Sequence, residues 1–132
     1  MHTKNTLKVR LSFIVALIYT LSILILSLID LHDIKIIELE SSDKVYHTFS
    51  YTLMVLFWMV HYKLKFKTIN FKHFFVLILS VIVFGIIIEY LQLFLTSYRS
   101  FDWWDVLSNT IGVIIGFILF MVAEKLFNTE KI

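Results

Sequence analysis

Four long apolar runs divide the sequence, and short polar segments separate them. The runs cover residues 11–29, 45–62, 74–94 and 106–123, and Glu89 is the one formally charged residue inside them. Each run is close to the roughly 20 residues that cross a bilayer as a helix. Hydrocarbon accepts a chain only when its backbone hydrogen bonds are closed, so the runs predict two transmembrane helical hairpins. The sequence has no proline, which leaves every run free to be helical.

The composition supports a membrane protein. Hydrophobic residues make up 59% of the 132 residues, and the mean hydropathy is +0.85. Soluble domains carry roughly 45–50% apolar residues, and a globule of this size could not bury so much apolar surface. We therefore expect an all-α, integral membrane four-helix bundle that forms a single domain over residues 1–132.

The first run follows Lys4, Lys8 and Arg10, as the apolar part of a signal peptide would. It is longer than the usual 7–15 apolar residues of a signal peptide, and no small-x-small cleavage site follows it. The sequence therefore favours an uncleaved first span.

Lysine and arginine are distributed unevenly between the two sides of the predicted bundle. Nine lie before the first run, between the second and third runs, or after the fourth run, and three lie in the other two connections. The positive-inside rule then predicts both termini in the cytoplasm. The formal charge of +2 and the scattered lysines give no sign of a nucleic-acid partner. The absence of cysteine excludes disulfides, thiolate nucleophiles and cysteine-ligated metals.

Polar residues gather near the predicted outer ends of three spans. Asp43, His47 and Tyr51 are spaced by four, which places them on one helix face. At 1.5 Å per residue, His47 lies about 6 Å below Asp43, and Asn109 lies about 6 Å below Asp105. Glu89 lies about 8 Å below the outer end of its span by the same rise. Charge is costly inside a membrane, so this shared depth predicts one polar site that faces outward.

The candidate residues divide into two roles. Candidates for acid–base or catalytic chemistry are His47, Glu89, Asp102 and Asp105. Candidates for binding an anionic head group are Asp43, Lys44, Tyr51, Gln92, Arg99 and Asn109.

Simpler interpretations of these residues remain open. Glu89 could pair with Arg99 or Lys44 and lock the hairpins together. Gly112 and Gly116 are most simply a face for close helix packing, and they could also contact a second copy of the chain. His47, Glu89, Asp102 and Asp105 could in principle form a mixed nitrogen and oxygen metal site. No paired-histidine motif accompanies them, so we expect neither a metal nor another cofactor.

The ordered motifs resemble the VanZ-like family. They are Asp43-Lys44-x-x-His47-x-x-x-Tyr51, Glu89-x-x-Gln92, Arg99-x-x-Asp102-x-x-Asp105 and Asn109-x-x-Gly112. The resemblance covers about three of the four spans, and the first span adds only length and hydrophobicity. The family takes its name from a protein associated with low-level teicoplanin resistance, so the resemblance implies a role at the cell envelope, in the cytoplasmic (inner) membrane of a bacterium.

Two classes of function follow from the sequence. The first is a membrane protein that binds or modifies the head group of a lipid or cell-wall precursor from outside, with an effect on glycopeptide susceptibility. The second is a non-catalytic structural or partner-binding protein whose buried polar residues lock the helices together. A transporter or channel is disfavoured, because the polar residues gather at one end and leave no path across the membrane. The residues are compatible with binding as well as with catalysis.

Overall fold

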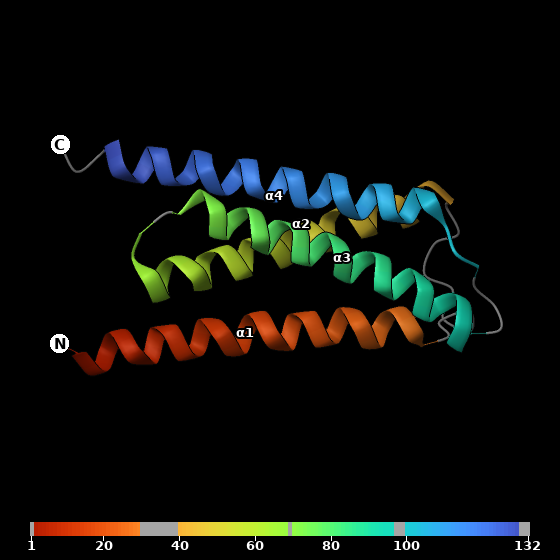
Figure 1. Ribbon diagram of the computed structural model, residues 1–132, viewed down its shortest axis with the longest axis horizontal. Helices are drawn as coiled ribbons and strands as arrows, with labels where there is room; N and C mark the ends of the chain where they lie inside the picture. The colour runs from red at the N-terminus through yellow and green to blue at the C-terminus, as the bar shows by residue number, and fades with distance from the viewer. Residues whose placement is uncertain (1, 30–39, 69, 97–99, 130–132) are drawn as a thin grey trace.

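A computed structural model describes residues 2–29, 40–68, 70–96 and 100–129, and these residues form four helices (Figure 1). The helices are α1 (His2–Leu28), α2 (Glu40–Phe66), α3 (Phe71–Leu95) and α4 (Trp103–Thr129). The predicted all-α four-helix fold is confirmed. Three helices contain a whole apolar run, and α1 contains all but the last residue of the first run. Each helix also continues into polar sequence at one end or both. Asn70 caps the start of α3, where its side chain accepts a hydrogen bond from the Lys72 backbone N–H.

Three of the helices contain segments that are long and apolar enough to cross a membrane. These segments are Asn5–Leu28, Phe71–Leu95 and Trp103–Phe127. Large apolar side chains such as Phe75 and Ile114 are exposed on their outer faces. Water would penalise that exposure, whereas lipid tails are a favourable environment for it.

Helix α2 is as long as α1 and α4 but is less apolar, because charged residues lie near both of its ends. It packs against each of the other three helices. Its Tyr51, Met54, Val55 and Met59 are almost completely buried, and they form much of the protein core. A helix covered by its neighbours exposes little surface to lipid, so α2 can carry more polar residues than the other helices.

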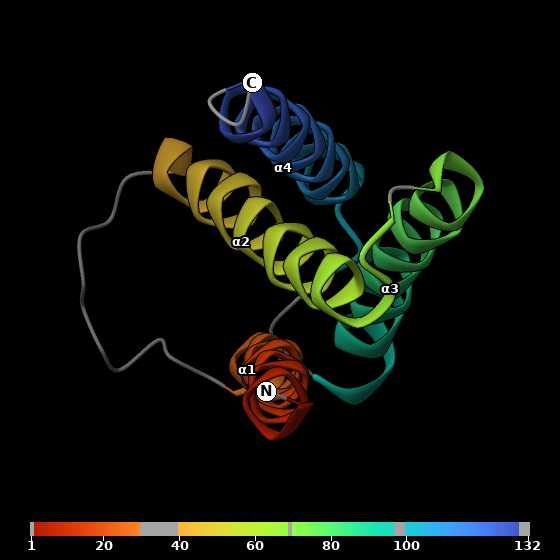
Figure 2. The same ribbon diagram turned by 90° about the vertical axis from the view of Figure 1, so that its left-hand side faces the viewer.

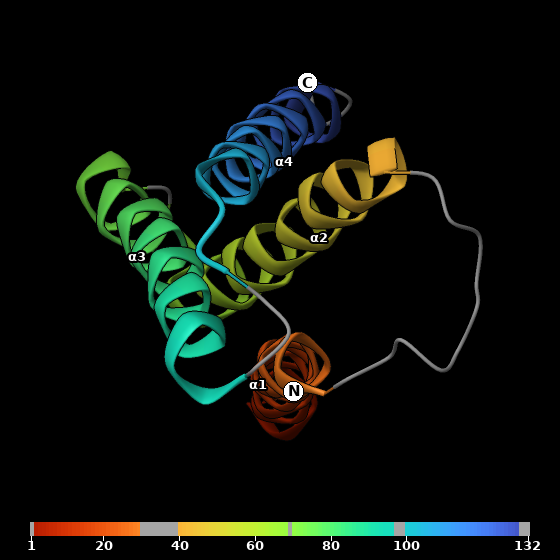
Figure 3. The same ribbon diagram turned by 90° about the vertical axis from the view of Figure 1, so that its right-hand side faces the viewer.

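The four helices run side by side, with both termini at the same end of the bundle (Figure 1). Helix α2 lies between α1 and α4, as the two end-on views show (Figures 2 and 3). The interface between α2 and α4 is the most extensive, whereas the described parts of α1 and α4 make no contact. We call the end where α1 and α3 finish and α2 and α4 begin the polar end.

The interface between α2 and α4 depends on two glycines of α4. A Cβ atom on Gly112 would collide with the backbone oxygen of Thr48, and one on Gly116 would collide with the Val55 side chain. The Thr52 hydroxyl is placed to donate a hydrogen bond to the Gly112 oxygen, at 2.9 Å. Close helix packing through these glycines is confirmed. Because α2 of the same chain occupies this face, an oligomer through it would require α2 and α4 to separate.

The opposite end of the bundle holds its own polar contacts. Lys63 of α2 forms an ion pair with Glu124 of α4. The hydroxyl of Ser12 in α1 lies 3.0 Å from Nδ1 of His61 in α2. These contacts join α2 to its two neighbours near the chain termini.

The Gly112→Ala substitution should destabilise the protein, although alanine is the better helix former. The added methyl group meets backbone rather than a movable side chain, so α2 and α4 must shift apart. Overpacking of this kind costs about 1–3 kcal/mol, and a lower Tm in detergent would report it. Gly85→Ala is the matched control, because its methyl group meets only side-chain atoms at 3.0–3.2 Å. A Tm for Gly112→Ala at or above that of the wild type would contradict the proposed packing.

Candidate functional site

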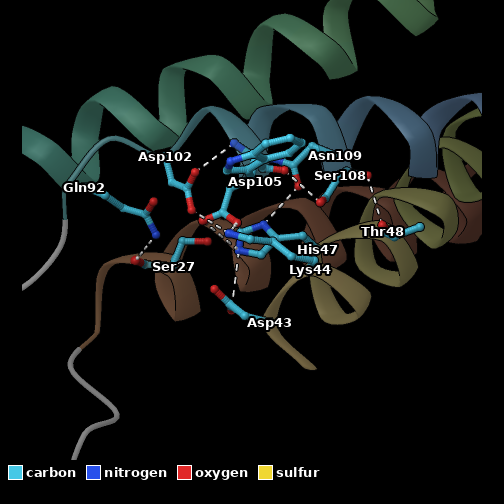
Figure 4. A network of polar contacts seen from close by, with 11 residues as sticks. Ser27, Asp43, Lys44, His47, Thr48, Gln92, Asp102, Asp105, Ser108 and Asn109 are labelled. Carbon is cyan, nitrogen blue, oxygen red and sulfur yellow. Dashed lines mark hydrogen bonds and ion pairs between the residues drawn. The ribbon is translucent and has the colours of Figure 1, made fainter. Parts of the chain in front are cut away.

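The candidate site is built where the first turns of α2 and α4 meet at the polar end (Figure 4). Asp102 precedes α4, and its Oδ1 accepts a hydrogen bond from the Trp104 backbone N–H at 2.8 Å. Asp105 lies in the first turn of α4. Carboxylates are favourable at a helix N-terminus, where backbone N–H groups have no partner within the helix. The local sequence therefore places both acids at the start of α4.

Lys44 of α2 links these two acids. Its Nζ lies 2.5 Å from Oδ2 of Asp102, and it also forms an ion pair with Oδ1 of Asp105. Burial acts to lower the pKa of Lys44, but the hydrogen bonds and charges of the two carboxylates outweigh it, and the net pKa is raised. The hydrogen bond from Lys44 lowers the pKa of Asp102. Lys44 therefore joins α2 to α4.

His47 lies one turn deeper than Asp43, and its side chain is 13% exposed. Its Nδ1 is 3.0 Å from Oδ1 of Asn109. An amide oxygen only accepts hydrogen bonds, so Nδ1 carries a hydrogen. Its Nε2 lies 3.7 Å from an oxygen of Asp43 and 3.7 Å from an oxygen of Asp105. Both distances are too long for a hydrogen bond, so Nε2 is close to two carboxylates without bonding to either.

A second, deeper layer is formed by Tyr51, Glu89 and Asn109, all almost fully buried. Gly85 leaves room for it, because a Cβ there would lie 3.0 Å from Cε1 of Tyr51 and 3.2 Å from Nδ2 of Asn109. Glu89 is one turn further along α3 and is close enough to interact electrostatically with Tyr51. Within the described residues, the Tyr51 hydroxyl and Nδ2 of Asn109 lack a hydrogen-bond partner. Buried polar atoms are normally paired, so this layer has hydrogen-bonding capacity for water or a ligand.

Gln92, which the sequence predicts as a head-group ligand, makes a hydrogen bond between helices. Its Nε2 donates to the Ser27 backbone oxygen at 2.9 Å, so it joins α3 to the end of α1. Amide side chains in membrane helices commonly form such bonds between helices. Arg99 lies outside the described residues, and so do its predicted contacts.

A pocket of about 160 Å³ lies beside His47, between α1 and α2. Helix α2 supplies a largely polar wall and α1 a largely apolar one. The lining residues are Ile23, Leu26, Ser27, Asp43, Tyr46, His47, Ser50 and Tyr51.

Sequence reasoning missed the contribution of α1 to this pocket and the space at Gly85. Serines and aliphatic residues are common in spans, so Ser27, Ser50, Ile23 and Leu26 gave no signal. The spacing of Gly85 and Glu89, one turn apart, could have indicated a glycine beside the buried acid.

Aromatic side chains surround the start of α4. Phe101 packs against Tyr90 of α3, with ring centroids 4.9 Å apart, and against Trp103 at 4.8 Å. Trp103 and Trp104 are largely exposed, as expected of aromatic residues at a membrane–water interface.

Comparison with known proteins identifies the family. The family model described as VanZ/LLP1 matches residues 3–124, which is nearly the whole chain. The chain therefore belongs to the VanZ/LLP1 family. Neither the search of curated proteins nor the search of solved structures gives a significant match.

The ion pair between Lys44 and Asp102 should make stability depend on pH in a definable way. Asp102 has a pKa below its ordinary value of 3.8, so its contribution is present above 3.8 and is lost as the pH falls through the lowered pKa. Lys44 has a pKa above its ordinary value of 10.5, so its contribution is present below 10.5 and is lost as the pH rises through the raised pKa. When the pH falls below 3.8, we expect the Tm of Asp102→Asn to decrease less than the Tm of the wild type does.

Lys44→Met serves as the partner control, because the hydrogen bond from Lys44 is the main cause of the lowered pKa of Asp102. Both variants should flatten the acid side of the Tm curve measured in detergent. An acid limb identical to that of the wild type in both variants would exclude this ion pair as a source of stability.

Proposed function

We propose that this VanZ/LLP1 protein binds the head group of a lipid or lipid-linked cell-wall precursor at the extracytoplasmic face of the bacterial cytoplasmic membrane. The observation that carries the proposal is the pocket between α1 and α2. Its polar wall contains Asp43, His47 and Ser50, and its apolar wall contains Ile23 and Leu26. A lipid presents the same two chemistries side by side, a polar head group and the first carbons of its tails.

His47 is the residue best placed to act on a bound head group. Asn109 holds Nδ1, which fixes the tautomer and leaves Nε2 for proton exchange at the pocket. Asp43 and Asp105 each hold a carboxylate oxygen 3.7 Å from that Nε2. His47 is therefore our candidate for a general acid or base, and Tyr51 and Asn109 are candidates for head-group hydrogen bonds.

The charges around the pocket limit the kinds of head group it can hold. Asp43, Asp102 and Asp105 supply three carboxylates near His47, and Lys44 is already paired with two of them. An anionic head group would therefore need further positive charge, such as that of a bound cation. A change in glycopeptide susceptibility on expression would follow if the head group belongs to a cell-wall precursor.

A second candidate function is a structural or partner-binding role without a ligand. The observation that favours it is the engagement of Lys44 by both Asp102 and Asp105, which joins α2 to α4. In that case Asp105→Asn should reduce the amount of protein in the membrane, because removing one partner leaves the other poorly compensated. Normal abundance together with loss of lipid binding would favour the first function.

Filling the pocket should prevent lipid binding without breaking the fold. Ser50→Phe places a bulky ring in the pocket and leaves the backbone oxygen of residue 50, which accepts the Tyr19 hydroxyl, unchanged. We expect the lipid that co-purifies with the detergent-extracted protein to fall at least about threefold, a change worth roughly 0.7 kcal/mol. Mass spectrometry of the retained lipids measures it.

Ser22→Phe is the matched control for pocket filling. Ser22 is on α1, its hydroxyl bonds only to the Ile18 backbone oxygen among the hydrogen bonds described here, and it is not part of the pocket lining. Equal lipid retention by the wild type, Ser50→Phe and Ser22→Phe would refute the head-group pocket.

The proposed orientation can be tested on a background that needs no prior mutation, because the chain has no cysteine. Ser100→Cys lies at the polar end, and Lys67→Cys lies between α2 and α3 at the opposite end. A membrane-impermeant maleimide added to intact cells should label Ser100→Cys and should label Lys67→Cys only after permeabilisation. The reverse pattern would place the polar end in the cytoplasm and remove the extracytoplasmic pocket.

A further inference from the structure

We propose that Asp43, His47 and Asp105 form a binding site for a divalent transition-metal ion such as Zn²⁺ or Mn²⁺. One potential ligand atom from each of the three side chains lies within 4.8 Å of the others. Nε2 of His47 is 3.7 Å from Oδ1 of Asp43 and 3.7 Å from Oδ2 of Asp105. The three atoms come from two helices and converge beside the pocket (Figure 4).

The distances are close to those of three ligands around one cation. Neighbouring ligand atoms at about 2.1 Å from a metal lie roughly 3.0–3.4 Å from one another. Both oxygens lie 3.7 Å from Nε2 of His47, a little outside hydrogen-bond range and a little outside this ligand–ligand range, and all three atoms lie within 4.8 Å of one another. A shift of a few tenths of an ångström would bring the three atoms to coordination distance.

The groups behind the ligands are arranged as they are in known metal sites. A ligating histidine usually gives its other ring N–H to an acceptor, which fixes the ring, and Asn109 accepts this bond from Nδ1 of His47. A ligating carboxylate is usually held by a hydrogen bond as well. Lys44 holds Oδ1 of Asp105, so Oδ2 remains available to the cation. Two of the three ligands are thus oriented by neighbours that do not compete for the same atoms.

The donor set indicates the class of metal. One imidazole with two carboxylates suits Zn²⁺ or Mn²⁺, whereas Mg²⁺ and Ca²⁺ prefer sites made only of oxygen. The sequence predicts no metal. The mixed ligand set that it could in principle form combines His47 with Glu89, Asp102 and Asp105. The geometry replaces Glu89 and Asp102 with Asp43, which is one helical turn from His47.

The pocket gives the proposed ion access to a further ligand. Asp43 and His47 line the pocket, so a coordination position on that side is open to a small group. A phosphate oxygen of a head group would bind a divalent cation there, which would supply the positive charge that the pocket lacks. This role for the ion rests on the proposed function, but metal binding itself does not.

Metal binding is measured on the full chain in detergent, purified without a histidine tag and stripped with chelator. Titration calorimetry with ZnCl₂ and with MnCl₂ should show saturable binding near one equivalent for at least one of these ions, and MgCl₂ should bind at least tenfold more weakly. Asp43→Asn should weaken the affinity for the bound ion at least tenfold, and the same ion should raise the Tm of the wild type but not of this variant. Asp43 is 47% exposed, so the variant should still fold.

Asp102→Asn is the matched control, because it removes an equal charge from the same cluster without removing a proposed ligand. It should keep the metal affinity within about threefold of the wild type. Absence of saturable Zn²⁺ and Mn²⁺ binding by the wild type would overturn the proposal. Equal weakening by Asp43→Asn and Asp102→Asn would also overturn it, because it would indicate attraction to negative charge alone.

The lipid-retention assay separates this proposal from the proposed function. Metal binding by the wild type together with unchanged lipid retention by Ser50→Phe would leave the metal site standing and remove the head-group pocket. Loss of lipid retention by Ser50→Phe without any metal binding by the wild type would support the head-group pocket and remove the metal site.

Discussion

Hydrocarbon cannot solvate a carboxylate or an ammonium group, and the interface between α2 and α4 is organised by that constraint. Lys44, Asp102 and Asp105 meet where these helices begin, so that each charge has an opposite charge beside it. One turn deeper, His47 and Asn109 join the same two helices. Deeper still, the Thr52 hydroxyl bonds to the Gly112 oxygen, where glycine allows close approach. The polar residues therefore need α2 and α4 in contact, and the glycines make that contact possible.

Much of the fold could be predicted from the sequence, because hydrocarbon imposes a length and a polarity on each span. The four runs match the four helices to within one residue at the end of α1, although the helices extend into flanking polar sequence that hydropathy does not detect. Hydropathy marks the second run as less apolar than the others, because α2 does not qualify as a membrane span whereas the other three helices do. It does not reveal that α2 is the central helix, since burial by protein and exposure to lipid both favour apolar residues.

The candidate site could also be predicted only in part, because spacing along a single helix is what the sequence reveals. Spacing along one helix fixes which side chains share a face and how deep they lie, so Asp43 with His47, and Asp105 with Asn109, could be placed in one layer. Spacing does not fix how one helix is rotated relative to another. Gln92 is at the predicted level, but it bonds to α1 instead of joining the acids. The space at Gly85 could not be predicted from spacing either, because it exists only where α2, α3 and α4 come together.

The position of the pocket follows from uneven packing of the bundle. Helix α1 packs mainly against α2, and its described residues make no contact with α4. At the polar end, α2 meets α4 through Lys44 and His47, and a pocket lies on its α1 side. Because the α1 side is the less tightly packed, a cavity can persist there beside His47. Helix α1 supplies the apolar wall of that cavity, and it also exposes much of its own apolar surface, as at Ile25 and Leu26. His47 stands at the boundary between the two sides of α2, because it contacts Asn109 of α4 and also lines the cavity beside α1.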